Sequence, residues 1–278
     1  MTFAIRVKPG TRVDLGSIDP SDNGGLTKKS GKKRMEQLAQ QIDDLQDTLY
    51  AAGQHGVLVV LQGMDTSGKD GTIRNVFRYI DPLGAKSWAF KVPTDLELRH
   101  DFLWRIHDKV PERGMVTIFN RSHYEDVLVV RVNNLAPVDV WRSRYEHINA
   151  FERLLAESNT IVLKFFLHVS PEEQRLRLLA READVEKSWK LSVSDWAQRQ
   201  SWSAYMEAYE DVLSKCSTKH APWQIVPADR KWFRNLAVAE AIVNALKPLK
   251  VGWIESLTSL GVERRKELEE YRARGGES

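Results

Sequence analysis

The sequence predicts an α/β fold, a three-layer sandwich in which about five parallel strands form a sheet with helices on both faces. Short apolar segments of strand length alternate with longer segments of helical periodicity. Glycine or proline separates several of these segments, as at Gly53, Pro111 and Gly114. A glycine-rich segment, residues 63–71, follows the first apolar strand and opens a helix. This alternation favours a parallel, doubly wound sheet with right-handed crossovers.

The expected elements follow from these patterns. Expected strands cover residues 57–62, 86–92, 115–119, 160–167 and 223–226. Expected helices cover residues 35–52, 69–80, 95–107, 138–157 and 232–246, with a further one starting at Pro171 and another ending near Ser214. Gly53 is a C-terminal cap for the first helix, and Thr94 is an N-terminal cap for the third.

Composition and charge limit the class of protein. A chain of 278 residues with 42% hydrophobic content can bury one sizeable core. A net charge of +3 does not by itself indicate a polyanionic partner. The longest apolar runs are strand-sized, and the first residues lack the layout of a signal peptide. The single cysteine, Cys216, cannot form an intrachain disulfide, so the expected compartment is the cytoplasm.

The glycine-rich segment has the spacing of a phosphate-binding loop, or P-loop. Gly63 is followed after four residues by Gly68 and Lys69. Glycines let the backbone curl so that its N–H groups form an anion nest, to which the helix N-terminus adds its dipole. Lys69 supplies a point charge for terminal phosphates. The loop residues expected to bind phosphate are Gly63, Met64, Thr66, Ser67, Gly68 and Gly71. The alternative is a glycine-rich turn without a ligand.

Two positions depart from the usual P-loop pattern. Asp70 stands where a serine or threonine usually holds magnesium, and Thr72 offers a hydroxyl two residues late. Asp65 lies inside the loop, where a carboxylate facing phosphates is repulsive unless a divalent cation lies between them. Asp65 is therefore the stronger candidate metal ligand. The alternatives are that Asp65 binds the loop backbone and that Asp70 is an acidic residue favoured by the helix dipole.

A second polar motif, residues 120–126, follows the expected strand 115–119. In a parallel sheet this is the carboxyl edge, where ligands bind. Asn120 stands where many P-loop enzymes have an aspartate. Arg121 can clamp a phosphate, and Glu125 and Asp126 add carboxylates for a metal or an acceptor nucleotide. The alternative is a salt-bridged helix N-terminus.

Four blocks together resemble the polyphosphate kinase 2 family: GMDTSGKDGTI, IFNRSHYEDVLVVRV, EKSWKLSVSDW and PADRKWFRN. The resemblance covers about residues 28–248. It implies a fold similar to thymidylate kinase with a mobile lid. It also implies the transfer of phosphate from inorganic polyphosphate to nucleotides, with Mg²⁺ as cofactor and Mn²⁺ as an alternative.

The resemblance assigns roles to several residues. It implies that Asp65, Lys69 and Arg121 are catalytic and that Asp65 handles the metal. Glu125, with its carboxylate in the second motif, is the other expected metal ligand. Some members have Asp where this chain has Asn120, so the resemblance leaves a second metal-binding carboxylate in doubt. At Glu125 the chain resembles the subgroup of this family that phosphorylates both AMP and ADP.

Basic residues outside the loop are candidates for the lid and for a polyphosphate track. Lid cations would close over a phosphate chain and exclude water; the expected ones are Arg181, Lys187 and Lys190. The candidate track residues are Lys28, Lys29, Lys32, Lys33 and Arg74, although a basic run such as residues 28–34 is more often a solvated surface. Trp189 is expected to pack in the core, with the alternative that it is a rigid anchor of the lid. Asp195 is expected to cap a helix and Arg177 to be a surface charge.

The whole chain is then expected to divide into three parts. Residues 1–34 form an irregular basic segment, residues 35–250 a P-loop kinase domain with a lid at about 182–195, and residues 251–278 a charged C-terminal helix or tail. The expected reaction is reversible transfer between polyphosphate and nucleotides, AMP to ADP and ADP to ATP. Two rivals remain, an ATP-dependent nucleotide or small-molecule kinase and a non-catalytic polyanion-binding protein. No nucleic-acid or membrane partner is expected, and the resemblance implies a homodimer or homotetramer.

Overall fold

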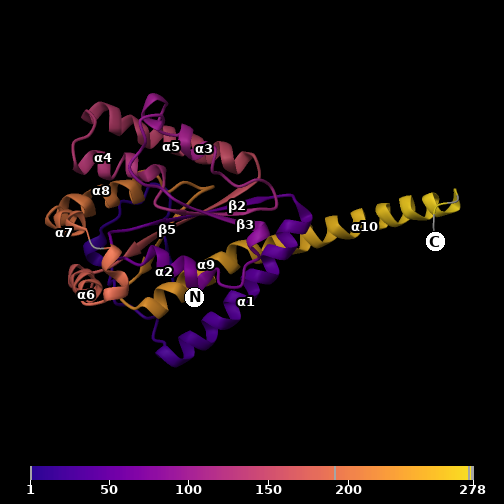
Figure 1. Ribbon diagram of the computed structural model, residues 1–278, viewed down its shortest axis with the longest axis horizontal. Coiled ribbons are helices and arrows are strands. Elements are labelled where there is room, and N and C mark those ends of the chain that lie inside the picture. Colours follow the sequence, from indigo (N-terminus) through magenta and orange to yellow (C-terminus); the bar gives the residue numbers. More distant parts are fainter. Residues whose placement is uncertain (1, 191, 275, 277–278) are drawn as a thin grey trace.

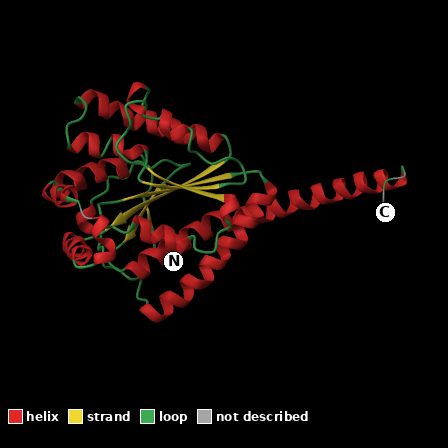
Figure 2. Cartoon of the chain, in the orientation of Figure 1, coloured by secondary structure: helices red, strands yellow, loops and turns green. Residues whose placement is uncertain are grey.

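A computed structural model describes residues 2–190, 192–274 and 276 of the chain, without the side chains of Lys187, Ser188, Lys190 and Ser194. The fold is an α/β sandwich (Figures 1 and 2), as the alternating pattern predicts. One six-stranded sheet has the order β1-β6-β5-β2-β4-β3. Its strands are β1 (Ile5–Arg6), β2 (Gly56–Gln62), β3 (Ala85–Ala89), β4 (Val116–Asn120), β5 (Thr160–His168) and β6 (Trp223–Pro227).

The five expected strands form the parallel part of the sheet. β2 lies between β4 and β5, and all seven of its residues are buried, which explains its unbroken apolar run. The pair Leu61 and Asn120 brings the carboxyl ends of β2 and β4 side by side. The P-loop and the second motif therefore leave the sheet at the same edge. The sixth strand, β1, adds an antiparallel edge that the sequence pattern did not indicate.

Helices cover both faces of the sheet (Figure 1). One face carries α1 (Lys28–Ala52), α2 (Lys69–Val76) and α9 (Lys231–Leu246), and the other carries α3 (Trp104–His107), α4 (Val129–Val132), α5 (Val138–Glu157) and α8 (Trp202–Lys215). The expected bounds of α5 are confirmed. The short 3₁₀ turns are η1 (Leu15–Ser17), η2 (Pro82–Gly84), η3 (Glu97–Arg99), η4 (His123–Asp126), η5 (Val185–Lys190) and η6 (Lys247–Leu249).

Helix α1 begins earlier than expected. It starts at Lys28 instead of residue 35, because Thr27 caps it by accepting a hydrogen bond from the Ser30 N–H at 3.2 Å. A Cβ on Gly31 would overlap the ring of Trp232, so this glycine allows the first turns of α1 to lie against α9. The basic run is thus helical from Lys28 onward, and the expectation of irregular structure up to residue 34 is wrong there.

The expected helix over residues 95–107 is also wrong. This segment forms η3 and the short helix α3, separated by an irregular stretch. Thr94 and Glu97 cap each other: the Thr94 N–H donates to Glu97 Oε2 at 2.7 Å, and the Glu97 N–H to Thr94 Oγ1 at 3.3 Å. Asp101 then accepts from the Leu103 N–H at 2.9 Å, which starts a new turn. Similarly, α2 ends at Val76 and not at residue 80.

The segment between β5 and β6 is helical. Ser170 caps α6 (Pro171–Glu182), which is followed by η5 and by α7 (Val193–Gln200) before α8 begins. The expected lid, about residues 182–195, therefore runs from the end of α6 through η5 into α7.

The last helix, α10 (Lys250–Ala273), projects away from the body of the molecule (Figure 1). Its one buried side chain is Trp253, whose Nε1 donates to His55 Nδ1 at 3.0 Å. Across the described residues, no helix combines the length and the apolar character that a membrane crossing requires.

Candidate active site

The P-loop takes its shape from residues with positive φ. It connects β2 to α2, and φ is +151° at Gly63, +62° at Thr66 and +108° at Gly68. A Cβ on Gly63 would lie 2.8 Å from the Leu167 carbonyl oxygen, and one on Gly68 would overlap the guanidinium of Arg234. Both glycines are therefore required for backbone conformation and for close approach.

Lys69 is folded back over the loop. Its Nζ donates to the carbonyl oxygens of Gly63 at 2.7 Å and Met64 at 3.2 Å, and only 7% of the residue is exposed. Burial, together with the neighbouring charge of Arg121, lowers the pKa of Lys69 to about 8. An anion in the loop would stabilise the charged form and raise this pKa.

The hydroxyl groups of the loop region lack protein partners. Thr66, Ser67 and Thr72 each have a buried side-chain oxygen without a hydrogen bond to any described residue. Buried polar atoms are usually paired. Of these three residues, Thr66 alone lines the pocket over the loop that is described below, so its hydroxyl is the one suited to phosphate oxygens.

Arg121 joins the two motifs. It follows β4 with φ at +63°, and its Nη1 donates to Glu125 Oε2 at 2.9 Å while Nη2 forms an ion pair with Asp65. Burial opposes the charge of Arg121, but the carboxylates of Glu125 and Asp65 outweigh it and raise its pKa. A strained, non-glycine αL residue held between two carboxylates is typical of a functional position.

Asn120 and Asp70 form a second link between the motifs. Asn120 Nδ2 donates to Asp70 Oδ1 at 2.6 Å. This bond ties the first turn of α2 to the end of β4. In this structure Asp70 therefore has a protein partner in the second motif.

Arg177 is not the surface charge that the sequence suggested. It is 9% exposed, and its guanidinium makes five hydrogen bonds. Two go to the P-loop carbonyls of Thr66 and Ser67, each at 3.0 Å. The others go to the Glu173 carboxylate and to the carbonyls of Ala228 and Asp229, between β6 and α9. Arg177 thereby braces the P-loop against the segment between β6 and α9.

Arg234 on α9 is a second buried arginine beside the loop. It is 2% exposed and donates to the Ser67 carbonyl at 3.1 Å and to Asn235 Oδ1 at 2.8 Å. Among the described residues, its guanidinium donates to these two neutral oxygens and forms no ion pair with a carboxylate. Burial and the neighbouring charge of Arg177 lower its pKa. The fold holds this cation at an electrostatic cost that a bound anion would relieve.

An open pocket of about 560 Å³, here called the phosphate pocket, lies over the P-loop. It brings together residues that the sequence analysis selected, namely Asp65, Thr66, Gly68, Lys69, Asp70, Gly71, Arg74, Asn120, Arg121 and Arg181. Gly63, Met64, Ser67 and Thr72 do not line it and lie within the loop or beneath it. Arg177 and Arg234 also line this pocket.

A second pocket of about 350 Å³, the side pocket, adjoins the first at Phe90, Lys91 and Arg121. Its walls are largely apolar, with Val92, Pro93, Val129, Val130 and Leu135. Besides Lys91 and Arg121, its polar residues are Arg105, Glu125, Asp126 and Gln198. Burial raises the pKa of Asp126 to about 6, against the opposing charges of Arg144 and Arg105.

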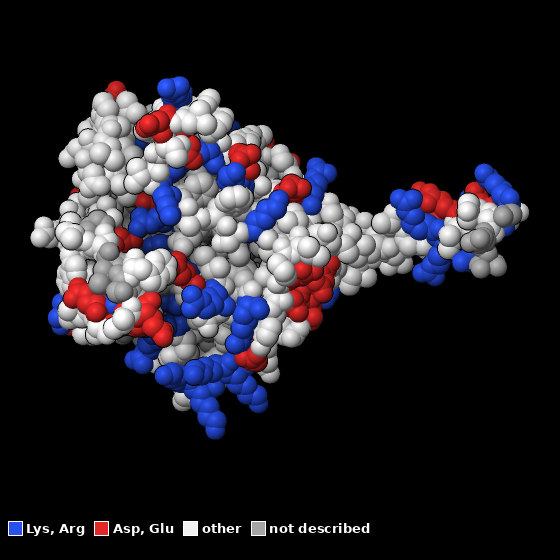
Figure 3. All heavy atoms as spheres, viewed as in Figure 1, with Lys and Arg blue, Asp and Glu red and all other residues white. Residues whose placement is uncertain are grey.

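A third open pocket of about 630 Å³, the distal groove, adjoins the phosphate pocket at Gly71, Lys231 and Arg234. Its basic residues are Lys28, Lys32, Arg78, Lys231 and Arg234. Figure 3 shows Lys and Arg side chains gathered where α1 begins. Of the track expected from the sequence, Lys28 and Lys32 line this groove and Arg74 the phosphate pocket, whereas Lys29 and Lys33 line neither.

The lid approaches the P-loop at Asp195. This residue lies in the first turn of α7 and does not cap it; its Oδ2 accepts from Arg181 Nη1 at 2.6 Å. Burial and the nearby carboxylate of Asp65 raise the pKa of Asp195. Trp189 is 77% exposed, so the expectation that it packs in the core is wrong. The side chains of Lys187 and Lys190, both expected to bind phosphate, lie outside the described structure.

Comparison with known proteins identifies the family. The model of the family described as polyphosphate kinase 2 matches residues 25–251. The chain belongs to the polyphosphate kinase 2 family. An AMP/ADP-polyphosphate phosphotransferase from Meiothermus ruber is 47% identical, over 91% of this chain and 96% of the relative. An ADP-polyphosphate phosphotransferase from Rhodopseudomonas palustris is 40% identical, over 98% and 97%.

A solved structure of the polyphosphate kinase 2 family supports the fold. The crystal structure of polyphosphate kinase 2 from Arthrobacter aurescens TC1 superposes with a TM-score of 0.84 at 42% identity, covering 87% of this chain and 88% of that one. The resemblance seen in the four sequence blocks is thus confirmed, and so is the expected P-loop kinase-like fold.

Within this polyphosphate kinase 2 chain, sequence reasoning missed Arg177 and Arg234 as neighbours of the P-loop. A signal existed for each. Gln174, Arg177 and Leu178 have the spacing of one helix face, and all three are buried. Arg234 lies in the block PADRKWFRN that carried part of the resemblance.

The pKa of Lys69 leads to a prediction about pH. Because polyanion binding requires the charged ammonium and raises its pKa, binding takes up a proton above pH 8. We expect the affinity for tripolyphosphate, measured by calorimetry without divalent cations, to be flat below about pH 8 and to fall up to tenfold per pH unit above it. Lys69→Met should abolish this dependence. An affinity of the unaltered protein that stays constant to pH 9.5 would contradict the assignment.

Proposed function

We propose that this chain catalyses Mg²⁺-dependent, reversible transfer of phosphate between inorganic polyphosphate and adenine nucleotides, taking AMP to ADP and ADP to ATP. The observation that supports the proposal most directly is a row of three pockets, in which the phosphate pocket lies between the side pocket and the distal groove and shares residues with each. Arg121 belongs to both the phosphate pocket and the side pocket, while Arg234 belongs to both the phosphate pocket and the distal groove. The names of the relatives from Meiothermus ruber and Rhodopseudomonas palustris support the substrate class.

Polyphosphate, the phosphate donor, occupies the basic end of this row of three pockets. A polyphosphate chain carries about one negative charge per internal phosphate, so it needs a long track of cations. The distal groove offers Lys28, Lys32 and Lys231, and Arg234 leads from it into the phosphate pocket. The end of the chain then reaches the P-loop, where backbone N–H groups, Lys69 and the helix dipole favour phosphate.

The acceptor nucleotide occupies the side pocket. Its apolar walls suit a purine ring, and its polar groups adjoin Arg121, where the nucleotide phosphate must arrive. Arg105 is held by the Lys91 carbonyl at 3.0 Å and lies over the ring of Phe90, 5.5 Å from its centroid. These contacts orient the arginine at the wall of the pocket.

Transfer is direct. An oxygen of the nucleotide phosphate attacks the terminal phosphorus of polyphosphate, the bond to the next bridging oxygen breaks, and the chain becomes one phosphate shorter. Lys69 and Arg121 stabilise the charge on the transferred group, and the lid excludes water as a competing acceptor. Nucleotide phosphates are largely ionised at neutral pH, so the step needs no strong general base.

Magnesium fits beside Asp65. This carboxylate lines the phosphate pocket with its side chain 14% exposed, and Mg²⁺ binds through one or two carboxylates together with substrate phosphates. Glu125 lines the side pocket and holds Arg121, so it is the weaker ligand of the two that we predict. When bound, the cation neutralises phosphate charge and orients the transferring group.

The test uses purified protein, Mg²⁺ and long-chain polyphosphate with either AMP or ADP, free of ATP. Ion-exchange chromatography should show ADP from AMP and ATP from ADP. Product formed only when ATP is added would indicate an ATP-dependent kinase. Polyphosphate binding without product in any mixture would indicate a polyanion-binding protein. Product from ADP alone would overturn the assignment to the subgroup that uses both nucleotides.

The distal groove predicts a dependence on chain length. We expect the double variant Lys28→Gln/Lys32→Gln to raise the KM for long-chain polyphosphate about tenfold, because each lost phosphate contact removes part of the counterion-release energy. The KM for tripolyphosphate should change less than twofold. The slope of log KM against log salt should flatten by about one for each lost contact.

The chain offers a matched control for this prediction. Lys29→Gln/Lys33→Gln makes the same charge change on the same helix, at residues that do not line the groove. An equal rise in KM for both double variants would show that the effect comes from the net charge of the protein and not from binding in the groove.

Asp65→Asn tests the metal site. We expect kcat to fall about a hundredfold, because a ligand-site change in a phosphoryl-transfer centre weakens both metal binding and charge neutralisation. The Mg²⁺ concentration for half-maximal rate should rise. Titration of the rate with Mg²⁺ and with Mn²⁺ checks this. An unchanged metal titration would remove Asp65 as a ligand.

We also propose that the chain forms a homodimer or homotetramer in the cytoplasm. The projecting helix α10 supports assembly, because Ile254, Leu268 and Tyr271 are exposed on it. Light scattering at micromolar concentration checks the state. The lone, buried Cys216 supports a reducing compartment.

A further inference from the structure

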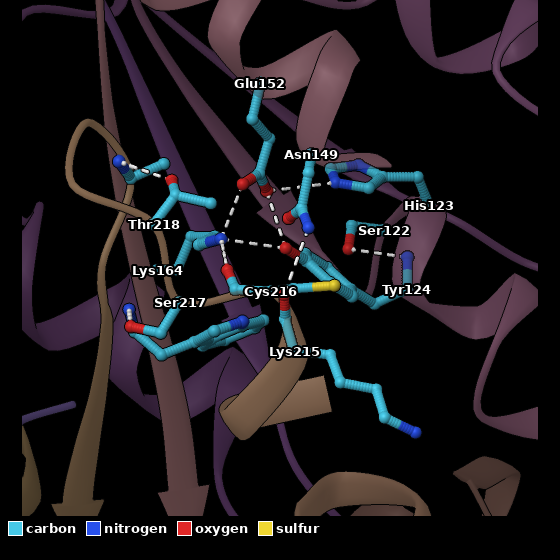
Figure 4. A network of polar contacts seen from close by, with 12 residues as sticks. Ser122, His123, Tyr124, Asn149, Glu152, Lys164, Lys215, Cys216, Ser217 and Thr218 are labelled. Carbon is cyan, nitrogen blue, oxygen red and sulfur yellow. Dashed lines mark hydrogen bonds and ion pairs between the residues drawn. The ribbon is translucent and has the colours of Figure 1, made fainter. Parts of the chain in front are cut away.

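A buried polar network lies behind the second motif (Figure 4). At its centre is Lys164 of β5, which is fully buried. Its Nζ donates to Tyr124 Oη at 2.8 Å, to Glu152 Oε2 at 2.5 Å and to the Cys216 carbonyl at 2.7 Å. All three ammonium protons thus have an acceptor, and the acceptors come from η4, α5 and the end of α8. We call Lys164, Glu152 and Tyr124 the core network.

The turn η4 has two faces. His123 and Tyr124 point inward: Tyr124 Oη donates to Glu152 Oε1 at 2.7 Å, and His123 Nε2 lies 3.3 Å from the same oxygen. The next residue, Glu125, instead accepts from Arg121 beside the phosphate pocket. Residues adjacent in sequence therefore connect the core network to the site.

The backbone of residues 121–126 needs support from other parts of the fold to keep its conformation. Arg121 has φ at +63°, which is costly for a non-glycine residue, and η4 is a single turn of four residues. Ser122 Oγ accepts from the Tyr124 N–H at 3.2 Å and from Gln62 Nε2 at 3.2 Å, which ties the turn to the last residue of β2. Asp126 at the end of η4 is held by Arg144 at 3.1 Å, and the core network adds a second, fully buried ion pair that anchors the turn from the opposite side of its sequence.

Stability alone is a poor explanation for the core network. Burial opposes the charge of Glu152, but Lys164 and His123 outweigh it and lower its pKa, so Glu152 stays charged. Burial lowers the pKa of His123, which stays neutral. Two opposite buried charges seldom stabilise a fold more than apolar groups of the same volume would. They do select one geometry, because any displacement leaves a charge without its partner.

We propose that Lys164, Glu152 and Tyr124 are positioning residues for phosphoryl transfer, which hold η4 so that Arg121 and Glu125 face the phosphate pocket. The inference rests on the proposed function. Without the core network, η4 is no longer held in one position against β5. A displacement of about 1 Å in a charge-stabilising group can cost up to a hundredfold in rate. The core network lines none of the three pockets, so we expect the effect to fall mainly on kcat.

The first test removes one hydroxyl. Tyr124→Phe disconnects η4 from the ion pair without creating a charge, and Tyr145→Phe on α5 is its matched control. Tyr145 is also buried, and its hydroxyl accepts from Arg131 at 3.5 Å, away from the pockets. We expect Tyr124→Phe to lower kcat about tenfold with KM values for ADP and polyphosphate within twofold. Tyr145→Phe should lose a similar amount of thermal stability and keep its kcat.

The second test removes both charges together. Lys164→Met/Glu152→Leu leaves no buried charge unpaired, so we expect a melting temperature near that of the unaltered protein and a kcat at least tenfold lower. Both variants retaining kcat within twofold would overturn the inference. If the double variant does not fold, Tyr124→Phe decides alone. An unaltered protein without activity would contradict the proposed function, and that outcome is separate from any result with the variants.

Discussion

Replacing Lys69 by methionine is expected to lower kcat/KM for polyphosphate by about a thousandfold or more, since removing a single charge-stabilising donor already costs a hundredfold to a thousandfold. Methionine keeps the length of the side chain and fills the buried space. It removes the ammonium that two loop carbonyls now hold directly above the anion nest. Steady-state rates with ADP and long-chain polyphosphate give the measurement.

Lys69→Arg tests whether another positive charge can replace the ammonium of Lys69. A guanidinium is larger and planar, and the space around Nζ is closed by the Gly63 and Met64 carbonyls, so arginine should restore little activity. Equal melting temperatures for the two variants would show that the fold is intact. A Lys69→Met variant with more than a tenth of the original rate would remove this lysine, and with it the P-loop assignment, from the mechanism.

Arg121→Met is expected to lower kcat about a thousandfold, because an arginine that stabilises a transferring phosphoryl group is worth at least that much. The substitution also leaves the carboxylates of Asp65 and Glu125 without their shared partner. Their repulsion of the incoming phosphates should raise the KM for the nucleotide as well. Rates over a range of ADP concentrations separate the two effects.

Arg121→Lys serves as the comparison. Lysine keeps the charge but has one nitrogen, so it can pair with only one carboxylate at a time. We expect it to restore the KM more than the kcat. A kcat close to the original in Arg121→Lys would mean that a positive charge at residue 121 is sufficient. The simultaneous pairing of the guanidinium with Asp65 and Glu125 would then have no role in the reaction.

Local patterns predicted the parts of the fold that depend on neighbouring residues. The strand β2 follows from an apolar run, and the P-loop with the start of α2 follows from a glycine spacing. The bounds of α5 follow from its periodicity alone. By contrast, β1 has two residues and exists because it pairs with β6, more than two hundred positions away, which no local pattern records.

The same distinction holds at the site. Residues of the two motifs were predicted because each follows a strand at the carboxyl edge. The bridge from Arg121 to Asp65 spans 56 positions, and it depends on the register of β2 and β4. Arg177 reaches the loop from 111 positions away and Arg234 from 167, so their roles arise only from tertiary structure.

The brace formed by Arg177 has a consequence for biosynthesis. Its guanidinium holds the P-loop carbonyls with one edge and the carbonyls of Ala228 and Asp229 with the other. During translation the P-loop leaves the ribosome long before β6, so the nascent chain carries the loop sequence without the strand end that completes its support. The support of the P-loop is therefore complete only after about four fifths of the chain has been made.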